Sequence, residues 1–267
     1  MKTRIFGAIL LIAIFVPFLI IGNLPFAILM AILSVSSVYE LLRVRESQKK
    51  FPASLKVIAY VVTLGICLCN IHSIDFQFNF DYRVMSLLIF VFLAPMVFIN
   101  DNKKYNFDDA LFMIGSVLFL GLSFNLIIIT RNYDITYIIY LLLITTLTDT
   151  FALVVGSLIG KNKLAPKISP KKTVEGLFGG VFMGTFAASA FYITVINTQA
   201  SLVLVIVLTT LLCLVGQLGD LVFSSIKRYY EIKDFSDLIP GHGGILDRFD
   251  SLIFVTLTFV ILVGRIL

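Results

Sequence analysis

Long apolar runs separated by short charged segments make up most of the sequence. Nine runs approach the length of about 20 residues that an α-helix needs to cross the hydrocarbon core of a bilayer. They cover residues 5–21, 24–42, 55–71, 84–99, 110–130, 136–159, 177–196, 202–223 and 251–264. This pattern predicts an all-α integral membrane protein, a polytopic bundle of about nine transmembrane helices that forms a single domain.

The composition excludes the other large classes of protein. Hydrophobic residues make up 59% of the chain, charged residues 14%, and the mean hydropathy is +1.01, whereas a soluble domain carries roughly a quarter charged residues. The three cysteines, Cys67, Cys69 and Cys213, lack the spacing of a zinc site. We therefore expect neither a disulfide nor a structural metal ion.

Basic residues are divided unequally between alternate loops. With the amino terminus in the cytoplasm, 18 of the 21 Lys and Arg residues lie on the cytoplasmic side, and only Arg83, Arg131 and Arg265 lie on the other. This bias predicts a multi-pass protein of the inner cell membrane with long cytoplasmic loops at 160–176 and 224–250. The net charge of +5 then reflects topology, so we expect no nucleic-acid partner.

The first apolar run follows Lys2 and Arg4, an arrangement that also occurs in secretory signal peptides. No cleavage site of small residues follows this run, and the chain continues equally apolar beyond it. We therefore expect the run to be retained as the first transmembrane helix.

Four aspartates lie within or next to the apolar runs of the second half of the chain. A carboxylate at the centre of a transmembrane helix costs about 2.5–3.5 kcal/mol on insertion scales, so each one needs a reason. Asp149 lies near mid-bilayer, Asp220 lies near a cytoplasmic helix end, and Asp247 and Asp250 begin the last helix. Hydrogen bonding to neighbouring threonines or snorkelling to the interface would explain one of them. Together they form an all-oxygen ligand set that suits Mg²⁺.

The two long loops contribute groups that attract anions. Three glycines surround His242, in the order Gly241, His242, Gly243 and Gly244, and they lead into a helix start, where backbone N–H groups and the helix dipole favour phosphate. The same glycines also suit a flexible turn. The loop at 160–176 contains five lysines, which suit a phosphate site or attraction to anionic lipid.

Carboxylates for a metal ion, many cations and a glycine-rich turn on one side of a membrane bundle suit phosphoryl or nucleotidyl transfer. Two like unit charges about 4 Å apart repel by about 4 kcal/mol at an effective dielectric constant near 20, so the meeting of two phosphates needs several cations. The sequence has no P-loop pattern. We therefore assign residues 136–267 as the catalytic half and residues 1–135 as N-terminal helices.

Residues 224–250 resemble the signature of the phosphatidate cytidylyltransferases, the CDP-diacylglycerol synthases. We refer to 224–250 as the signature segment. The positions that match are Ser224, Ile226, Lys227, Arg228, Lys233, Asp234, Ser236, Ile239, Pro240, His242, Gly243, Gly244, Ile245, Asp247, Arg248, Phe249 and Asp250.

The stretch 149–176 resembles the same family. The matching positions are Asp149, Ala152, Gly156, Gly160, Lys161, Lys163, Leu164, Pro166, Ser169, Pro170, Lys172, Thr173 and Gly176. Phe151 replaces a usual glycine and Leu153 a usual aromatic residue, which bears on pocket shape more than on charge. Residues before 140 match only as apolar helices.

The resemblance implies transfer of the cytidylyl group of CTP to phosphatidate, which yields CDP-diacylglycerol and pyrophosphate and requires Mg²⁺. It assigns Asp220 and Asp247 to the metal, with Asp149 and Asp250 as further ligands or neighbours of the ligands. The implied catalytic residues are Lys227, Arg228, Lys233, Asp234, His242 and Arg248. The implied substrate-binding residues are Ser169, Lys171, Lys172, Thr173, Ser224, Gly243 and Gly244.

The sequence leaves two other functions open. A CTP-dependent polyprenol or lipid kinase would use similar groups but transfer the γ-phosphate. A transporter would need polar groups along a path through both leaflets, whereas this chain concentrates them on one side. The sequence also leaves open a second, monovalent cation and a homodimer.

Overall fold

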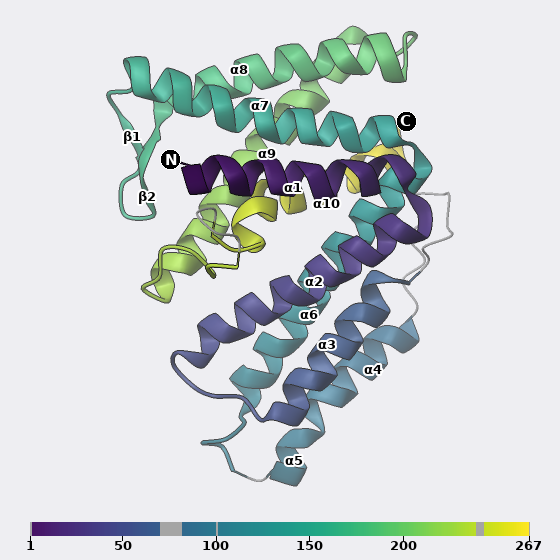
Figure 1. The fold of residues 1–267 in the computed structure, drawn as a ribbon, viewed down its shortest axis with the longest axis vertical. Coiled ribbons are helices and arrows are strands. Elements are labelled where there is room, and N and C mark those ends of the chain that lie inside the picture. Colours follow the sequence, from purple (N-terminus) through teal and green to yellow (C-terminus); the bar gives the residue numbers. More distant parts are fainter. Residues whose placement is uncertain (1, 70–81, 100, 239–242, 267) are drawn as a thin grey trace. The chain divides into compact units, whose positions relative to one another are not determined.

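The computed structural model describes residues 2–69, 82–99, 101–238 and 243–266, and side chains within 11–262 of these ranges. The described chain is almost entirely helical (Figure 1). Its elements in chain order are α1 (Lys2–Ile21), α2 (Asn23–Glu46), α3 (Ala53–Cys67), α4 (Tyr82–Leu93), α5 (Pro95–Ile99), α6 (Phe107–Tyr133), α7 (Ile135–Ile159), β1 (Lys163–Ala165), β2 (Ser169–Thr173), α8 (Val174–Phe191), the π-helical turn η1 (Tyr192–Ile196), α9 (Leu202–Tyr229) and α10 (Leu246–Ile266).

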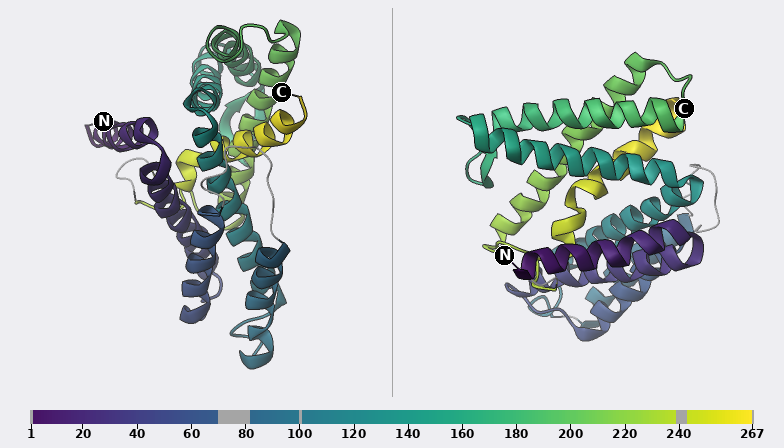
Figure 2. Two further views of the ribbon diagram at one scale, coloured as in Figure 1. Left: turned by 90° about the vertical axis from the view of Figure 1, so that its right-hand side faces the viewer. Right: turned by 45° about the horizontal axis from the view of Figure 1, so that its top comes forward.

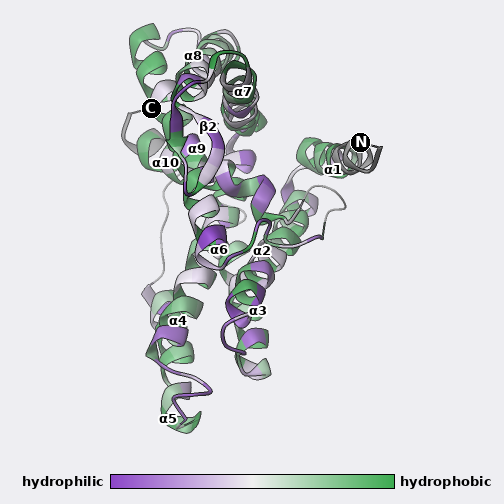
Figure 3. Cartoon of the chain, turned by 90° about the vertical axis from the view of Figure 1, so that its left-hand side faces the viewer, coloured by the Kyte–Doolittle hydropathy of each residue, from purple (hydrophilic) through white to green (hydrophobic). Residues whose placement is uncertain are grey.

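Six helices among the described residues are long and apolar enough to cross a membrane. They are α2, α4 continued by α5, α6, α7, α8 continued by η1, and α9. Residues 11–21 and α3 form shorter apolar helices. In Figure 3 hydrophobic residues, coloured green, recur along all the long helices. These findings agree with the prediction of an all-α, multi-pass membrane protein.

The chain divides into two compact units that do not follow a single cut in the sequence. The first unit contains Met1–Asn132 and Asp234–Leu246, and the second contains Tyr133–Lys233 and Asp247–Leu267. The signature segment is therefore divided between them: 224–233 and 247–250 belong to the second unit, and 234–246 belongs to the first.

A buried ion cluster joins helix ends in the first unit. Asp109, at the start of α6, is fully buried and pairs with Arg45 and Lys49 near the end of α2. Asn106 completes the start of α6, because its side chain accepts from the Asp109 backbone N–H at 2.9 Å while its own N–H donates to the Asp109 carboxylate at 3.1 Å. This reciprocal cap satisfies donors that a helix start otherwise leaves unpaired.

Close approach of α7 and α8 defines the second unit, where the two helices lie side by side (Figures 1 and 2). Glycines at every fourth position of α8 make this approach possible. A Cβ atom on Gly180 would lie 2.4 Å from the Thr148 carbonyl oxygen, and one on Gly176 would lie 2.6 Å from the Ala152 carbonyl oxygen. Larger residues at these positions would force the two helices apart.

The loop at 160–176 contains a small antiparallel hairpin, β1 paired with β2, which the all-α prediction did not include. Strands of three and five residues have no hydrophobic alternation that would reveal them in the sequence. Glu175 fastens the base of the hairpin, because its carboxylate accepts hydrogen bonds of 3.1 Å from the backbone N–H groups of Lys161 and Asn162. The hairpin leads directly into α8.

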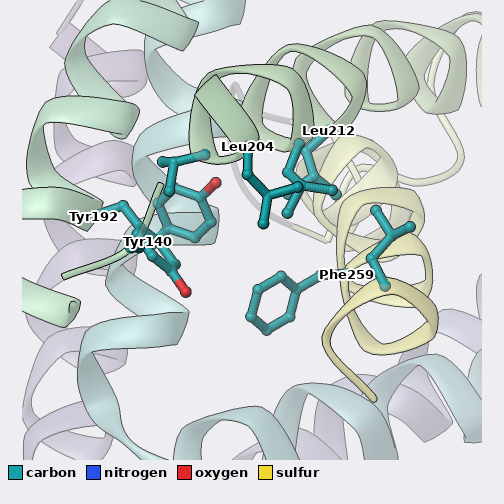
Figure 4. A pocket seen from close by; sticks show the side chains of 9 residues that line it. Tyr140, Tyr192, Leu204, Leu212 and Phe259 are labelled. Carbon is teal, nitrogen blue, oxygen red and sulfur yellow. The ribbon is translucent and has the colours of Figure 1, made fainter. Parts of the chain in front are cut away.

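An apolar pocket lies between α7, η1, α9 and α10 in the second unit (Figure 4). Tyr140, Tyr192 and Phe259 line it together with aliphatic side chains, and the Tyr140 hydroxyl hydrogen-bonds to that of Thr209 at 2.7 Å. Its lining contains no charged side chain. A nucleoside triphosphate needs cations to neutralise its negative charge, so we place the candidate active site elsewhere.

Candidate active site

A chain of polar side chains connects α7, the hairpin and α9 within the second unit. The amide of Gln217 donates to the Asp149 carboxylate at 2.6 Å, and its carbonyl oxygen accepts from the Lys172 ammonium at 2.9 Å. Lys172 also pairs with Asp220 at 2.6 Å. One predicted metal-binding carboxylate, Asp149, is therefore connected to a predicted substrate-binding lysine through a glutamine, and a second, Asp220, pairs with that lysine directly.

A second ion pair joins α9 to α10. The Lys227 ammonium lies 2.6 Å from the Asp247 carboxylate, and both side chains are largely buried, with exposed fractions of 11% and 4%. Ser224, one turn before Lys227, donates from its hydroxyl to Asp220 at 3.2 Å. The pair connects a predicted catalytic cation to a predicted metal ligand.

Helical spacing explains why these groups of α9 act together. Gln217, Asp220, Ser224 and Lys227 follow one another at intervals of three or four residues, so they share one face of the helix. Gly219 lies between them and allows α10 to approach, because a Cβ atom there would lie 3.0 Å from the Asp250 carbonyl oxygen. The apolar character of the remaining faces fits a membrane-spanning helix.

The hairpin positions Lys172 through its connection to α8. Thr173, the next residue, is the N-cap of α8, and its hydroxyl accepts from the Gly176 N–H at 3.1 Å. Gly160, the C-cap of α7, makes room for this threonine, since a Cβ atom there would lie 2.7 Å from the Thr173 hydroxyl oxygen. The family positions Gly160, Thr173 and Gly176 therefore have a packing role that sets the place of Lys172.

Three carboxylates of the second unit lie near enough to repel one another: Asp149, Asp220 and Asp250. Lys172 and Lys227 oppose this repulsion. Like charges gathered in one place in this way favour the binding of a cation. The three carboxylates thus place negative charge where a lysine ammonium group, a metal ion or both can compensate it.

These oxygens fit a divalent cation that shares its ligands with phosphate. Mg²⁺ takes oxygen ligands and usually binds through one or two carboxylates together with substrate phosphates. Among the described residues, no group of three His, Cys, Asp or Glu side chains has the arrangement of a complete metal site. The donor set is therefore suited to a cation that arrives with a nucleotide rather than to one caged by protein alone.

Other predicted residues of the second unit lie around this network. The Arg228 guanidinium is exposed and donates to the carbonyl oxygens of Ile168 at 3.1 Å and Ile232 at 2.9 Å, which ties the end of α9 to the hairpin. Lys171, Lys233 and Arg248 are exposed, and Ser169 is half-buried at the start of β2. The exposed cations remain accessible to an anionic substrate.

Four predicted residues do not belong to the described part of the second unit. Asp234, Gly243 and Gly244 lie in the first unit, where Asp234 is exposed and Gly243 has a φ of +80°, a conformation that favours glycine. His242 lies outside the described residues. Gly244 is buried against Glu40, with only 2.6 Å between its ideal Cβ position and a carboxylate oxygen.

Sequence reasoning missed two polar residues that the structure connects to predicted site residues. Gln217 was not among the predicted site residues, because an uncharged amide near a helix end carries little insertion cost. Its spacing of three residues from Asp220, which places both on one face of the helix, was the available signal. Glu40 was missed because it lies in an apolar run of the N-terminal half. Its intramembrane charge was the available signal.

Comparisons with known proteins agree with this arrangement. The model of the cytidylyltransferase family matches residues 2–266. The phosphatidate cytidylyltransferase of Bacillus subtilis (strain 168) is 35% identical over 263 residues, which cover 96% of this chain and 94% of the relative. Those of Staphylococcus saprophyticus and Staphylococcus aureus (strain COL) are 35% and 36% identical, with 96% of each chain covered. The resemblance seen in the signature segment is confirmed, and this chain belongs to the cytidylyltransferase family.

Proposed function

We propose that this chain transfers the cytidylyl group of CTP to phosphatidate and thereby makes CDP-diacylglycerol and pyrophosphate for phospholipid synthesis. The relatives that cover nearly its whole length carry the name of this activity. The observation that carries the proposal within the molecule is the network in which Asp220 and Asp247 pair with Lys172 and Lys227. A membrane enzyme with such a network can bring phosphates of a nucleotide and a lipid together.

In the proposed reaction, a phosphate oxygen of phosphatidate attacks the α-phosphorus of CTP. A new phosphorus–oxygen bond forms as the bond from the α-phosphorus to the bridging oxygen of the β-phosphate breaks, and pyrophosphate leaves with that oxygen. No general base is required, because a phosphate monoester is mostly ionised near neutral pH. The protein contributes positioning and neutralisation of charge.

The carboxylates provide the proposed metal site. Asp220 and Asp247 would hold Mg²⁺, and Asp149 and Asp250 would act as further ligands or support them. When bound, the metal supplies charge neutralisation for the triphosphate. A second, monovalent cation is an additional part of this proposal.

The cations and small residues provide the proposed phosphate sites. Lys227, Arg228, Lys233 and Arg248 would bind triphosphate or lipid phosphate, with Lys171 and Lys172 adding charge from the hairpin. Hydroxyl groups and backbone N–H groups would add hydrogen-bond donors. These come from Ser169, Thr173, Ser224, Gly243 and Gly244, with Asp234 and His242 completing the signature.

For the topology, we propose nine transmembrane helices, a cytoplasmic amino terminus and an active site that faces the cytoplasm from the inner cell membrane. The distribution of Lys and Arg supports this orientation. Single cysteines placed in the loop at 160–176 and at the start of α4, at residues 82–83, in a chain whose own cysteines are replaced, should be labelled from opposite sides of the membrane. A homodimer, which the sequence leaves open, is testable by light scattering of the detergent-solubilised chain.

Position-specific labelling of CTP tests the reaction. With phosphatidate vesicles and Mg²⁺, label on the α-phosphate should appear in the lipid fraction, and label on the γ-phosphate should leave in pyrophosphate. The kinase alternative predicts the reverse, with γ-label in the lipid and α-label in soluble CDP. Absence of turnover together with flux through vesicles would favour a transporter.

A further inference from the structure

A buried carboxylate of α2 contacts the signature segment within the first unit. Glu40 is completely buried, and its carboxylate accepts from the backbone N–H groups of Ile245 at 2.8 Å and Leu246 at 2.9 Å. The Ser236 hydroxyl donates to the same carboxylate at 2.5 Å. A residue of the second transmembrane helix thus binds backbone and side chain about 200 positions later in the chain.

We infer that Glu40 is a positioning residue for the signature segment: its carboxylate holds the backbone at the start of α10, one residue before Asp247. This inference rests on the proposed function. It adds to that function a residue of α2, which lies outside the signature segment and outside the stretch 149–176.

Burial of a charge explains why this contact is specific. An ionised carboxylate away from water needs hydrogen-bond donors, because its desolvation is otherwise costly. The first N–H groups of a helix lack partners within the helix, and a negative charge there interacts favourably with the helix dipole. α10 begins at Leu246, so Glu40 supplies from α2 the acceptor that a helix usually obtains from its own N-cap.

Covalent connection carries the effect to the proposed metal ligand. Leu246 and Asp247 are neighbours in the chain, so the direction in which the Asp247 side chain leaves the backbone depends on how the start of α10 is held. Gly244 adds to this control, because a Cβ atom there would lie 2.6 Å from a Glu40 carboxylate oxygen. Glycine at 244 is therefore required for the carboxylate to reach the two N–H groups.

α2 offers a matched control at Glu46, six positions later. Its carboxylate accepts from the Phe51 N–H at 3.2 Å and pairs with Lys56 at 2.9 Å, and its side chain is 23% exposed. Glu46→Gln is the same chemical change in the same helix at a residue that binds the α2–α3 connection. Glu40→Gln instead replaces one acceptor oxygen by an amide group that faces a backbone donor.

The test combines hydrogen exchange with kinetics on the full-length chain in detergent. In Glu40→Gln we expect amide exchange across 243–247 to accelerate at least about tenfold, the loss expected for one hydrogen bond to a charged acceptor. The Mg²⁺ concentration for half-maximal turnover should rise and kcat should fall. Glu40→Asp should recover part of both losses, and Glu46→Gln should match the wild-type chain.

Each outcome decides the inference. Wild-type exchange across 243–247 in Glu40→Gln, or a loss of turnover with an unchanged Mg²⁺ requirement, would overturn it and leave a purely structural role. If Glu40→Gln does not fold, Ser236→Ala, which removes only one hydrogen-bond donor, must show smaller changes of the same sign in amide exchange, Mg²⁺ requirement and kcat. If the wild-type chain does not convert CTP and phosphatidate, the proposed function fails, while the exchange measurement still tests the contact.

Discussion

Carboxylates are held in different ways in the two units. In the first unit, Asp109 is completely buried between Arg45 and Lys49 and also accepts a hydrogen bond from the Asn106 backbone. In the second unit, Asp220 and Asp247 have lysines of the family motifs as their ion-pair partners. The first arrangement caps a helix, whereas the second places cations that can turn from a carboxylate to a phosphate.

This difference teaches how to distinguish structural from functional acids in a membrane protein. Insertion cost alone marks both kinds. A carboxylate whose partners include the backbone of its own helix start is fixed by the fold, so its removal should act on stability. A carboxylate paired with a lysine side chain near other carboxylates can exchange that partner for a metal ion, so its removal should act on turnover.

The largest expected effect comes from the carboxylates of the second unit. Asp220→Asn and Asp247→Asn should each lower turnover by on the order of a thousandfold, because they remove charge that holds the proposed metal next to the triphosphate. Transfer of α-labelled CTP into lipid measures this at increasing Mg²⁺. Asp237→Asn, an exposed aspartate of the signature segment, is the control. Full activity in either variant would refute its assignment as a metal ligand.

Removal of divalent cations tests the same site without a mutation. Excess EDTA should abolish transfer, and added Mg²⁺ should restore it, because carboxylates and phosphates share a hard cation. The same chelation should leave the thermal unfolding of the substrate-free chain nearly unchanged, since no complete protein cage for a metal occurs among the described residues. Persistent transfer in EDTA would contradict a metal-dependent mechanism.

A smaller effect is expected at the hairpin. Lys172→Met should reduce kcat/KM by about tenfold to a hundredfold, because it removes one cation from the meeting point of several phosphates. Lys167→Met is the matched control, since Lys167 is an exposed lysine of the turn between β1 and β2. Equal losses in the two variants would show that the hairpin acts through its overall charge rather than through the contacts of Lys172.

The smallest effect on turnover is expected at Asp109 of the first unit. Asp109→Asn should lower the free energy of unfolding by about 3 kcal/mol, because it breaks a buried ion pair and leaves charge uncompensated. Turnover per folded molecule should stay as in the wild-type chain. Unfolding in detergent, compared with Asp108→Asn at the exposed neighbouring position, measures the difference. Loss of turnover without loss of stability would break the distinction between the two units.

Much of this architecture could be predicted from local patterns. Apolar runs revealed the membrane helices, and the spacing of Lys227, Arg228 and Asp247 identified the signature segment. Helix bounds were predicted less accurately where a helix continues past its apolar run into charged residues. The helix α9 extends to Tyr229, six residues past the predicted end of its apolar run. Backbone hydrogen bonding continues there in water, so hydropathy does not mark the end.

Insertion cost and motif spacing are properties of single segments, so the sequence by itself determined that this chain is a membrane protein of the cytidylyltransferase family and which acids and cations are the candidates for its chemistry. Only the tertiary structure decided how those groups are paired: that Gln217 connects Asp149 to Lys172, that a hairpin carries Lys172, and that Glu40 holds the start of α10. The physical reason is that partners of buried polar groups come from segments far apart in the chain. The hydropathy of the surrounding sequence indicates that a buried polar group needs a hydrogen-bond partner, whereas the packing of the helices determines which group is that partner.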